Sequence, residues 1–367
     1  MNNNSAIILR AGPRAIEHIR LHGLQAMDIA AIPAAAGGPK GLILQAFDQW
    51  IFGEWLMRAP RNRSLIGASI GAWRMTAASM PDPVQGFARL GKLYCQQIYP
   101  LKPSSTYVTE VIQELLANFI DGHEHEIVQQ PVGRLHILTS KGRGMLTAPR
   151  RSLSTKAGFI AATVANVGAR SHLARHMERV VIGDQRDQLL WLKTKFDAFP
   201  TEFSELTTDN LKTALLASGT LPLIMDPVRR IPSAPTGTYW DGGLIDYHLA
   251  LPYTRISVSE PNGLVLYPHF TDHIVPGWLD KAFAWRRASK GKNRHWLDNV
   301  LLVAPSAEFI RSLPRQKLPD RKDFTFHAAN HQLRIQEWQN AIGASEKLRD
   351  AFAAFVQNPD TRLIQPF

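Results

Sequence analysis

Cysteine is almost absent from this chain of 367 residues, which has only Cys95. A single cysteine excludes an internal disulfide framework, and it excludes zinc or iron–sulfur sites built from several cysteines. No stretch approaches the roughly 20 apolar residues that a membrane-spanning helix needs. Arg10, Pro13 and Arg14 interrupt the apolar residues near the N-terminus, which leaves no signal-peptide core. We therefore expect a cytoplasmic protein, although export by a route without a cleaved signal is also compatible with these absences.

Acidic residues are fewer than basic residues in this chain. The chain has 42 Lys and Arg against 31 Asp and Glu, which gives a formal net charge of +11. Such an excess attracts anionic partners, either nucleic acid or a phospholipid surface. With 45% hydrophobic and 20% charged residues, the composition is that of a folded chain and excludes extensive disorder.

Short apolar stretches alternate with segments of helical spacing. Strands are expected at residues 26–33, 64–66, 135–138, 179–182, 238–240, 263–267 and 299–303. Helices are expected at residues 44–55, 72–80, 112–119, 210–218, 335–342 and 348–355. This alternation predicts an α/β fold, a three-layer α/β/α sandwich with a mainly parallel central sheet. No repeat or long linker divides the chain, so we expect a single domain over residues 1–367.

The strongest chemical signal is Gly67-Ala68-Ser69-Ile70-Gly71, which lies between a predicted strand and a predicted helix. A nucleophilic serine must project from a tight strand-to-helix turn, and small residues two positions away on either side allow that turn to form. The amides at the start of the following helix favour negative charge there. A glycine-rich turn with a capping serine would give the same pattern, which also occurs by chance in many chains.

A second glycine-rich segment, Gly37-Gly38-Pro39-Lys40-Gly41, also follows a predicted strand. It matches neither the Walker pattern nor Gly-x-Gly-x-x-Gly, so a phosphate loop is excluded. Consecutive glycines let backbone amides turn toward an oxyanion, with Gly37 and Gly38 as donors. Pro39 has no N–H and fixes the loop, and Lys40 adds positive charge.

Asp241-Gly242-Gly243 is the third signal, at the end of a predicted strand. The two glycines leave room for the carboxylate of Asp241 to reach a neighbouring loop. A plain Asp-Gly turn is the common alternative for such a sequence.

The order of these three motifs resembles that of the patatin-like phospholipases. The stretch Ala-Leu-Leu-Ala-Ser-Gly-Thr-Leu-Pro at residues 214–222 is similar to the Ala-Ser-x-x-x-Pro stretch that precedes the aspartate in that family. The resemblance covers residues 26–250, and residues 251–367 match nothing in it. Ala36 stands where many members have a further glycine, and Asp246 and His248 stand where members often continue with Asn-Pro.

The resemblance implies a Ser–Asp dyad rather than a Ser–His–Asp triad. Ser69 would attack an ester carbonyl, and Asp241 would accept its proton and later activate water. Gly37 and Gly38 would hold the tetrahedral oxyanion. The expected activity is that of a serine lipid acyl hydrolase, a phospholipase A-type enzyme or a lysophospholipase or esterase that works through an acyl-enzyme. Neither a metal nor an organic cofactor is expected.

The sequence leaves three other interpretations open. His248 and His269 follow the aspartate in the order that a Ser–Asp–His triad needs, although we favour a role for both as bystanders. An acyltransferase would use the same acyl-enzyme with an alcohol acceptor. A non-catalytic basic module that binds lipid or nucleic acid would retain the fold without the chemistry.

Two groups of histidines raise the question of a metal site. His123 and His125 follow a predicted turn and are interpreted as part of a solvated loop. His327 and His331 are expected on one helix face, but no glutamate beside them completes a zincin pattern. We therefore predict no metal site.

A basic run lies between Trp285 and Trp296 in the C-terminal third. Its cations and flanking indoles suit contact with a membrane surface, and no nucleic-acid-binding motif accompanies them. Residues 267–296 are a candidate lid or membrane-contact segment. The residues expected to contact the membrane are Arg286, Arg287, Lys290, Lys292 and Arg294.

Overall fold

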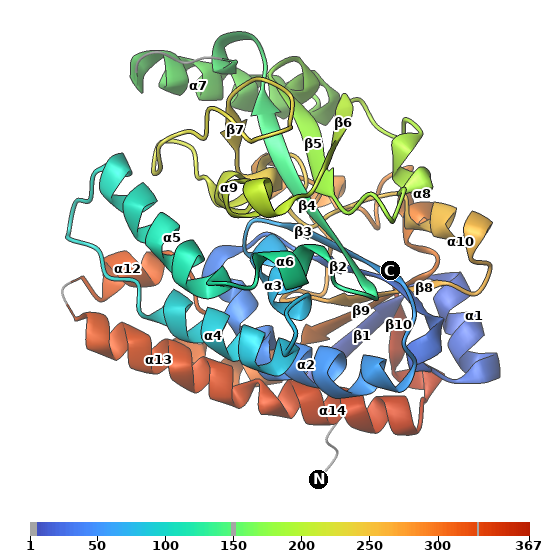
Figure 1. Cartoon of the computed structure of the whole chain (residues 1–367). Helices are drawn as coiled ribbons and strands as arrows, with labels where there is room; N and C mark the ends of the chain where they lie inside the picture. The colour runs from blue at the N-terminus through green and yellow to red at the C-terminus, as the bar shows by residue number, and fades with distance from the viewer. Residues whose placement is uncertain (1–5, 148–151, 329) are drawn as a thin grey trace.

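The computed structural model describes residues 6–147, 152–328 and 330–367. These residues form a ten-stranded sheet in the order β10-β1-β9-β8-β2-β3-β4-β5-β6, with β7 paired to β4 (Figure 1). The strands are β1 (Ile7–Ala11), β2 (Ile29–Ala34), β3 (Arg63–Ala68), β4 (Gly133–Gly142), β5 (Met177–Gly183), β6 (Thr201–Glu205), β7 (Tyr239–Trp240), β8 (Leu264–Pro268), β9 (Val300–Pro305) and β10 (Ile364–Pro366).

The sheet is mixed and mostly parallel. Strands β9, β8, β2, β3 and β4 are parallel, whereas β1 is antiparallel to β9 and β5 is antiparallel to β4. The central strands read Ile-Ala-Ala-Ile-Pro-Ala in β2 and Val-Leu-Leu-Val-Ala-Pro in β9, and every residue of both is buried. Such continuous apolar runs are typical of strands that are covered on both faces. β1 and β10, from the two ends of the chain, pair in the same sheet.

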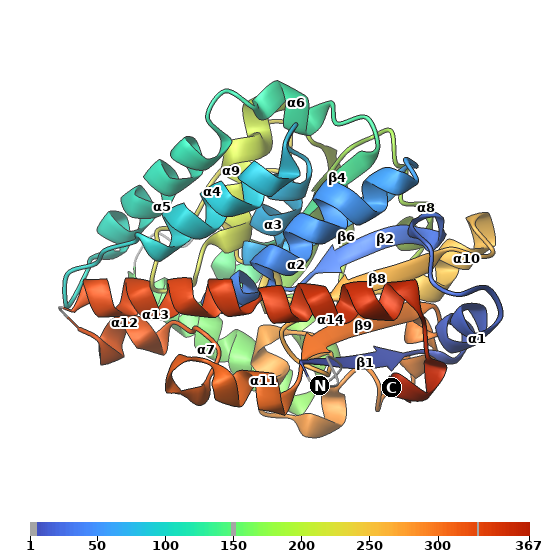
Figure 2. The ribbon, with the colours of Figure 1, turned by 90° about the horizontal axis from the view of Figure 1, so that it is seen from below.

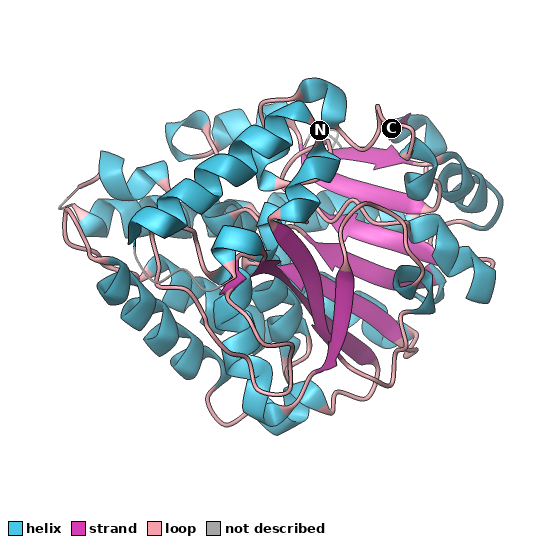
Figure 3. Cartoon of the chain, turned by 90° about the horizontal axis from the view of Figure 1, so that it is seen from above, coloured by secondary structure: helices cyan, strands magenta, loops and turns pink. Residues whose placement is uncertain are grey.

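Helices cover one face of this sheet. Figure 2 shows α2, α3, α4, α13 and α14 in front of the strands, and Figure 3 shows the strands from the opposite side, with other helices and loops around them. The helices are α1 (Pro13–His22), α2 (Gln45–Trp50), α3 (Ile70–Ala78), α4 (Pro83–Cys95), α5 (Ser105–Ile120), α6 (Glu124–Val128), α7 (Ser152–Gly168), α8 (Leu190–Lys193), α9 (Thr208–Gly219), α10 (Ile256–Ser259), α11 (Ala307–Ser312), α12 (Lys322–Phe326), α13 (His331–Ala344) and α14 (Glu346–Gln357).

The predicted α/β class and mostly parallel sheet are confirmed. Each strand predicted from the sequence overlaps a strand of the structure, but β1, β6 and β10 were not predicted. The prediction of one regular helix over residues 44–55 is wrong, because the short α2 is followed by a π-helical turn at Ile51–Trp55. Among the described residues, no helix combines the length and the hydrophobicity needed to cross a membrane.

The topology brings three chain segments to one place. Strands β2 and β3 are parallel neighbours, so the loops after Ala34 and Ala68 leave the same edge of the sheet. β7 pairs with the end of β4, with Trp240 opposite Ser140. In open α/β sheets, ligands bind at the carboxyl ends of the strands. The three predicted motifs therefore meet at the edge where a ligand site is expected.

Candidate active site

Ser69 lies at the sharp turn between β3 and α3. Its backbone has φ 55° and ψ −130°, a conformation that a residue with a Cβ rarely adopts. Such strain costs on the order of 1–3 kcal/mol and persists only where the surrounding structure enforces it. The turn directs a buried serine to the N-terminus of α3, as the nucleophile-elbow interpretation of the sequence requires.

The flanking glycines are required by close packing of the backbone. A Cβ on Gly71 would lie 1.9 Å from the carbonyl oxygen of Ala34, and a Cβ on Gly67 would lie 2.4 Å from the amide nitrogen of Ala72. Any side chain at either position would therefore push α3 away from β2 or from its own turn. This explains why the motif has glycine on both sides of Ser69.

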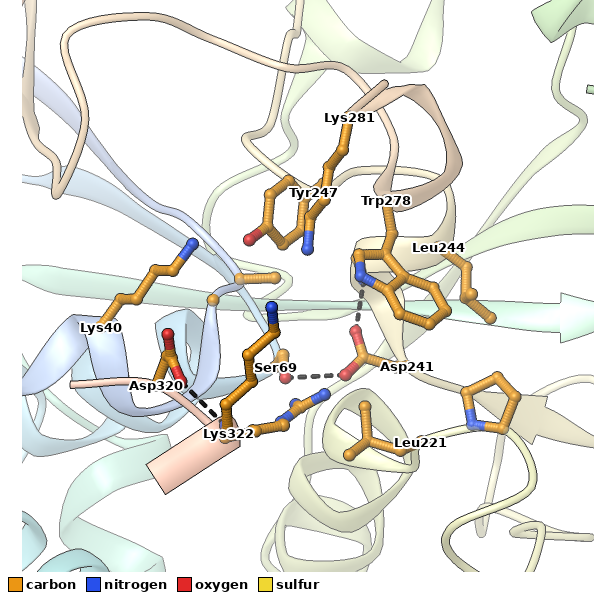
Figure 4. Close-up of a pocket in the computed structure, with 15 residues that line it drawn as sticks. Lys40, Ser69, Leu221, Asp241, Leu244, Tyr247, Trp278, Lys281, Asp320 and Lys322 are labelled. Atoms are coloured by element: carbon orange, nitrogen blue, oxygen red, sulfur yellow. Dashed lines mark hydrogen bonds between the residues drawn. The ribbon is translucent and has the colours of Figure 1, made fainter. Parts of the chain in front are cut away.

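Asp241 is the hydrogen-bond partner of Ser69 (Figure 4). The Ser69 hydroxyl donates to Asp241 Oδ2 over 2.8 Å, and the Gly243 N–H donates to Asp241 Oδ1 over 2.7 Å. Burial raises the pKa of Asp241 above its ordinary value, although the nearby Arg321 and the two hydrogen bonds oppose that shift. The distance lies within the range for direct proton transfer between a nucleophile and a base.

Gly242 and its neighbours fix the position of Asp241. A Cβ on Gly242 would lie 2.1 Å from the carbonyl oxygen of Leu138 in β4, so only glycine allows this close approach. The Asp241 N–H donates to the carbonyl oxygen of Thr220 over 2.8 Å. The Asp-Gly-Gly sequence therefore packs against β4 and hydrogen-bonds to the end of α9. A plain Asp-Gly turn would need neither contact.

Ser218 gives a structural role to the Ala-Ser-x-x-x-Pro stretch. Its hydroxyl accepts the N–H of Ser69 over 2.8 Å and donates to the carbonyl oxygen of Leu138 over 2.7 Å. It therefore fixes the strained turn of Ser69 to β4. Leu221 and Pro222 from the same stretch line a cavity beside Ser69.

The glycine-rich loop after β2 lies next to the dyad. Gly38 has a φ of 58°, which favours glycine, and no acceptor among the described residues takes the N–H of Gly37 or Gly38. The Ala36 N–H instead donates to the carbonyl oxygen of Tyr247 over 2.9 Å, so this amide is already engaged. Gly37 borders the same cavity as Ser69, which is compatible with its predicted role as an oxyanion donor.

Two other residues of that loop have different surroundings. Lys40 lines the cavity beside Ser69, with its ammonium 5.5 Å from the ring centre of Phe270. Gly41 faces Ile70 and Arg74 of α3, where a Cβ would make ordinary contacts at 3.4 Å. Lys40 is therefore at the site, whereas Gly41 packs the loop against the helix that follows Ser69.

Two cavities meet at Ser69. The first, here called the polar cavity, has a volume of about 320 Å³ and contains Asp241 and four cationic side chains. The second, the apolar cavity, has a volume of about 270 Å³. Ser69, Leu221 and Arg321 line both. The side chains that make the second cavity apolar include Trp73, Val108, Ile112, Ile224, Met225 and Phe324.

Part of the polar cavity comes from residues that sequence reasoning missed. Trp278 and Lys281 follow β8, and Asp320, Arg321 and Lys322 precede or begin α12. All five belong to the segment 251–367 that resembled no family. They lie in loops and short helices without a periodic pattern, and no motif marks them.

The two histidines of the alternative triad lie elsewhere. The Val275 N–H donates to His248 Nδ1 over 3.1 Å, and the Thr271 N–H donates to His269 Nδ1 over 2.9 Å. Both rings are fully buried, and burial lowers the pKa of both, that of His269 to about 3. Neither imidazole is hydrogen-bonded to the dyad in the described part of the chain, so the structure does not bring a triad together.

Asp246, the second acid after Asp241, is also occupied. Arg179 of β5 donates to both of its carboxylate oxygens, at 2.6 and 2.8 Å.

The structure also contains a buried ion pair that the sequence analysis did not predict. Arg74 of α3 donates to both carboxylate oxygens of Asp48, at 2.7 and 2.8 Å. This pair connects α2, which follows the glycine-rich loop, to the helix that follows Ser69.

The histidines considered as metal ligands are dispersed. His327 follows α12 and its Nε2 lies 2.9 Å from Glu337, whereas His331 begins α13, so the expectation that both share one helix face is wrong. His123 and His125 lie at the start of the short helix α6 rather than in a loop. Within the described ranges, no three His, Cys, Asp or Glu side chains gather as a group that could hold a metal ion.

Two members of the basic run are fixed to the rest of the chain. Arg286 donates to the carbonyl oxygen of Asn166 and to Asp280, both over distances below 3 Å, and Arg294 donates to the carbonyl oxygen of Phe367 over 2.6 Å. Lys290 and Lys292 are exposed. A membrane contact through this run stays a prediction, and it would depend mainly on the exposed lysines.

Asp280 secures the part of the candidate lid that borders the polar cavity. Its buried carboxylate accepts hydrogen bonds from Asn166, Arg170 and Arg286. Trp278 and Lys281, on either side of it, are thereby held at the cavity mouth. Opening or closing of residues 267–296 stays a prediction.

The chain was also compared with known proteins. No family model, no curated protein and no solved structure matches it.

Proposed function

We propose that the protein is a serine acyl hydrolase that cleaves lipid esters with a Ser69–Asp241 dyad. The observation that carries the proposal is the 2.8 Å hydrogen bond from a strained, buried serine to a buried carboxylate. Backbone strain at a serine beside a base is a recurrent feature of nucleophilic sites. The order of the three motifs adds the resemblance to patatin-like phospholipases, for which a three-layer α/β/α fold is expected.

In the first half of the reaction, the Ser69 Oγ attacks the ester carbonyl as its proton passes to Asp241. The tetrahedral intermediate carries a negative charge on the former carbonyl oxygen, which the Gly37 and Gly38 amides stabilise. Loss of one such donor typically costs about 10²–10³ in rate. When the intermediate collapses, the ester C–O bond breaks, and Asp241 returns the proton to the departing alkoxide. The alcohol leaves and the acyl group remains on Ser69.

In the second half, Asp241 accepts a proton from water as the water oxygen attacks the acyl-enzyme. The second tetrahedral intermediate uses the same amides. Its collapse breaks the bond to Ser69 Oγ, which regains the proton from Asp241 and releases the carboxylic acid. The dyad is restored, and no redox step or metal is involved in this sequence.

The apolar cavity supports a fatty acyl substrate. It reaches Ser69 and is lined by Trp73, Ile224 and Phe324 among other apolar side chains. Burial of an acyl chain contributes about 0.8 kcal/mol for each methylene removed from water. A cavity of this kind beside a nucleophile therefore favours esters of long-chain acids over acetate esters.

Hydrolysis of p-nitrophenyl esters by purified variants tests the proposal. We expect the wild-type protein to hydrolyse the laurate ester, and Ser69→Ala and Asp241→Asn each to lower kcat/KM by at least about 10³. Asp350→Asn, which changes an exposed carboxylate on α14, is the matched control and should keep full activity. Full activity in Asp241→Asn would overturn the dyad.

A further inference from the structure

Four cations surround the polar cavity. Lys40 comes from the glycine-rich loop, Lys281 from the segment after β8, and Arg321 and Lys322 from the start of α12. Figure 4 shows the side chains of Lys40, Lys281 and Lys322 extending from different sides toward the space beside Ser69. Three separate segments thus place positive charge around one small volume.

None of these cations forms an ion pair within the described part of the chain, whereas the two carboxylates that line the cavity are both engaged. Asp241 is bound to Ser69 and Gly243. Asp320 accepts the Lys322 N–H over 2.8 Å and lies 3.2 Å from the ammonium of Lys317, outside the cavity lining. The two carboxylates offset part of the charge of the four cations, which leaves the cavity lining with an excess of positive charge.

The cations also repel one another. Burial lowers the pKa of Lys40; Asp320 opposes this shift, and the neighbouring Lys317 and Arg321 add to it. Burial, Lys40 and Arg321 lower the pKa of Lys281, and Asp241 opposes this shift, although much of this side chain contacts solvent. Its ammonium lies 4.0 Å from the ring centre of Tyr247, a contact that holds the charge at the cavity mouth. Such an arrangement is unfavourable alone and becomes favourable when an anion binds between the cations.

We propose that the polar cavity binds a phosphate group carried by the alcohol part of the ester, so that the enzyme prefers acyl esters of phosphate-bearing alcohols. This inference rests on the proposed acyl hydrolase function. The acyl chain occupies the apolar cavity, and the polar cavity, which also borders Ser69, is then left for the leaving group. A guanidinium and three ammonium groups suit a phosphate with two negative charges, whereas a quaternary ammonium in a zwitterionic head group would be repelled.

The four cations would determine specificity without taking part in bond making. The experiment compares kcat/KM for three lauroyl esters at concentrations below micelle formation: lysophosphatidic acid, lysophosphatidylcholine and monolauroylglycerol. We expect the phosphate monoester to be preferred over the neutral ester by about 10-fold to 100-fold, since a hydrogen bond to a charged group contributes about 1.5–3 kcal/mol.

Lys281→Gln/Lys322→Gln is the test variant, because both side chains are exposed enough to be replaced without unfolding the chain. Lys212→Gln/Lys347→Gln removes the same charge from exposed sites away from the cavity and is the control. We expect the test variant to lose at least about tenfold more kcat/KM on the phosphate ester than on the neutral ester. The control should keep the preference of the wild-type protein.

The outcomes separate this inference from the function on which it rests. Equal turnover of all three esters would overturn the phosphate preference and leave the acyl hydrolase standing. No turnover of these esters or of p-nitrophenyl laurate would overturn the proposed function itself. Lauroyl coenzyme A, a thioester, is a further arm and is compared with S-lauroyl-N-acetylcysteamine, the same kind of thioester without phosphates. A preference for the phosphate-bearing member among the oxygen esters or among the thioesters supports the inference and shows which leaving group the cavity takes.

Discussion

The Ser69 hydroxyl and the Asp241 carboxylate lie 2.8 Å apart although 172 positions separate them in the sequence. β4 brings the two residues together. It pairs with β3, which ends just before Ser69, and with β7, which ends just before Asp241. The dyad is therefore fixed by two strands that pair with the same edge of β4, whereas β5 pairs with its other edge. Ser218 reinforces it by hydrogen bonding to both Ser69 and Leu138 of β4.

The pH dependence of the reaction should reflect the burial of Asp241. Asp241 must be ionised to accept the proton of Ser69, and burial raises its pKa above the ordinary value of 3.8. Activity is therefore lost as the pH falls through that raised pKa, and the acid limb of kcat/KM should lie above 3.8. A neutral ester is the substrate to use, because Lys281, whose pKa is lowered to about 7, then has least influence. A rate that stays constant down to the ordinary aspartate pKa would contradict this assignment.

The strain at Ser69 predicts a difference between two inactive variants. Ser69→Ala and Ser69→Gly both remove the hydroxyl, but only glycine adopts a φ of 55° without strain. We expect Ser69→Gly to be the more stable of the two by about 1 kcal/mol in urea unfolding. Equal stability would mean that the turn relaxes and that no strain is stored there.

Two glycines near the dyad should tolerate alanine very differently. Gly71→Ala would place a Cβ 1.9 Å from the carbonyl oxygen of Ala34, so we expect loss of activity together with a lower melting temperature. Gly41→Ala would place its Cβ at ordinary contact distances, and we expect near-normal stability. Thermal unfolding and ester hydrolysis of the two variants check this contrast. A Gly71→Ala protein of normal stability would show that α3 can shift away from β2.

The buried pair of Asp48 and Arg74 should be important for stability. Their side chains are only 1% and 3% exposed, so Asp48→Ala leaves a buried guanidinium without its partner. We expect a loss of about 3–5 kcal/mol in urea unfolding, and recovery of most of it in Asp48→Leu/Arg74→Met. Glu17→Gln, which removes one partner of an exposed pair, should leave stability unchanged. If the double variant were no more stable than the single one, lost packing rather than the unpaired charge would explain the effect.

The dyad could be predicted because its signals are local. The turn at Ser69 needs small residues at Gly67 and Gly71, and the packing at Asp241 needs Gly242, so each constraint appears within a few positions of the residue concerned. Apolar runs likewise predicted the central strands. β10 was missed because it has only three residues, and β6 because its residues are half-buried or exposed rather than alternating.

The cationic side of the site could not be predicted in this way. Lys281 and Arg321 lie in segments that follow β8 and β9, and only the tertiary fold places them at the cavity beside Ser69. Neither residue belongs to a motif or to a periodic pattern. The Asp48–Arg74 pair joins two helices, and no motif in either helix marks these residues as partners. Such contacts depend on the tertiary structure, and no short stretch of sequence records them.

Covalent labelling with a fluorophosphonate tests whether Asp241 activates Ser69, because it requires an activated serine but no knowledge of the substrate. We expect one adduct per chain, located on Ser69 by mass spectrometry of the peptides. Labelling should disappear in Ser69→Ala and slow strongly in Asp241→Asn, with Asp350→Asn as the folded control. An adduct on another residue, or labelling at the wild-type rate in Asp241→Asn, would contradict the dyad.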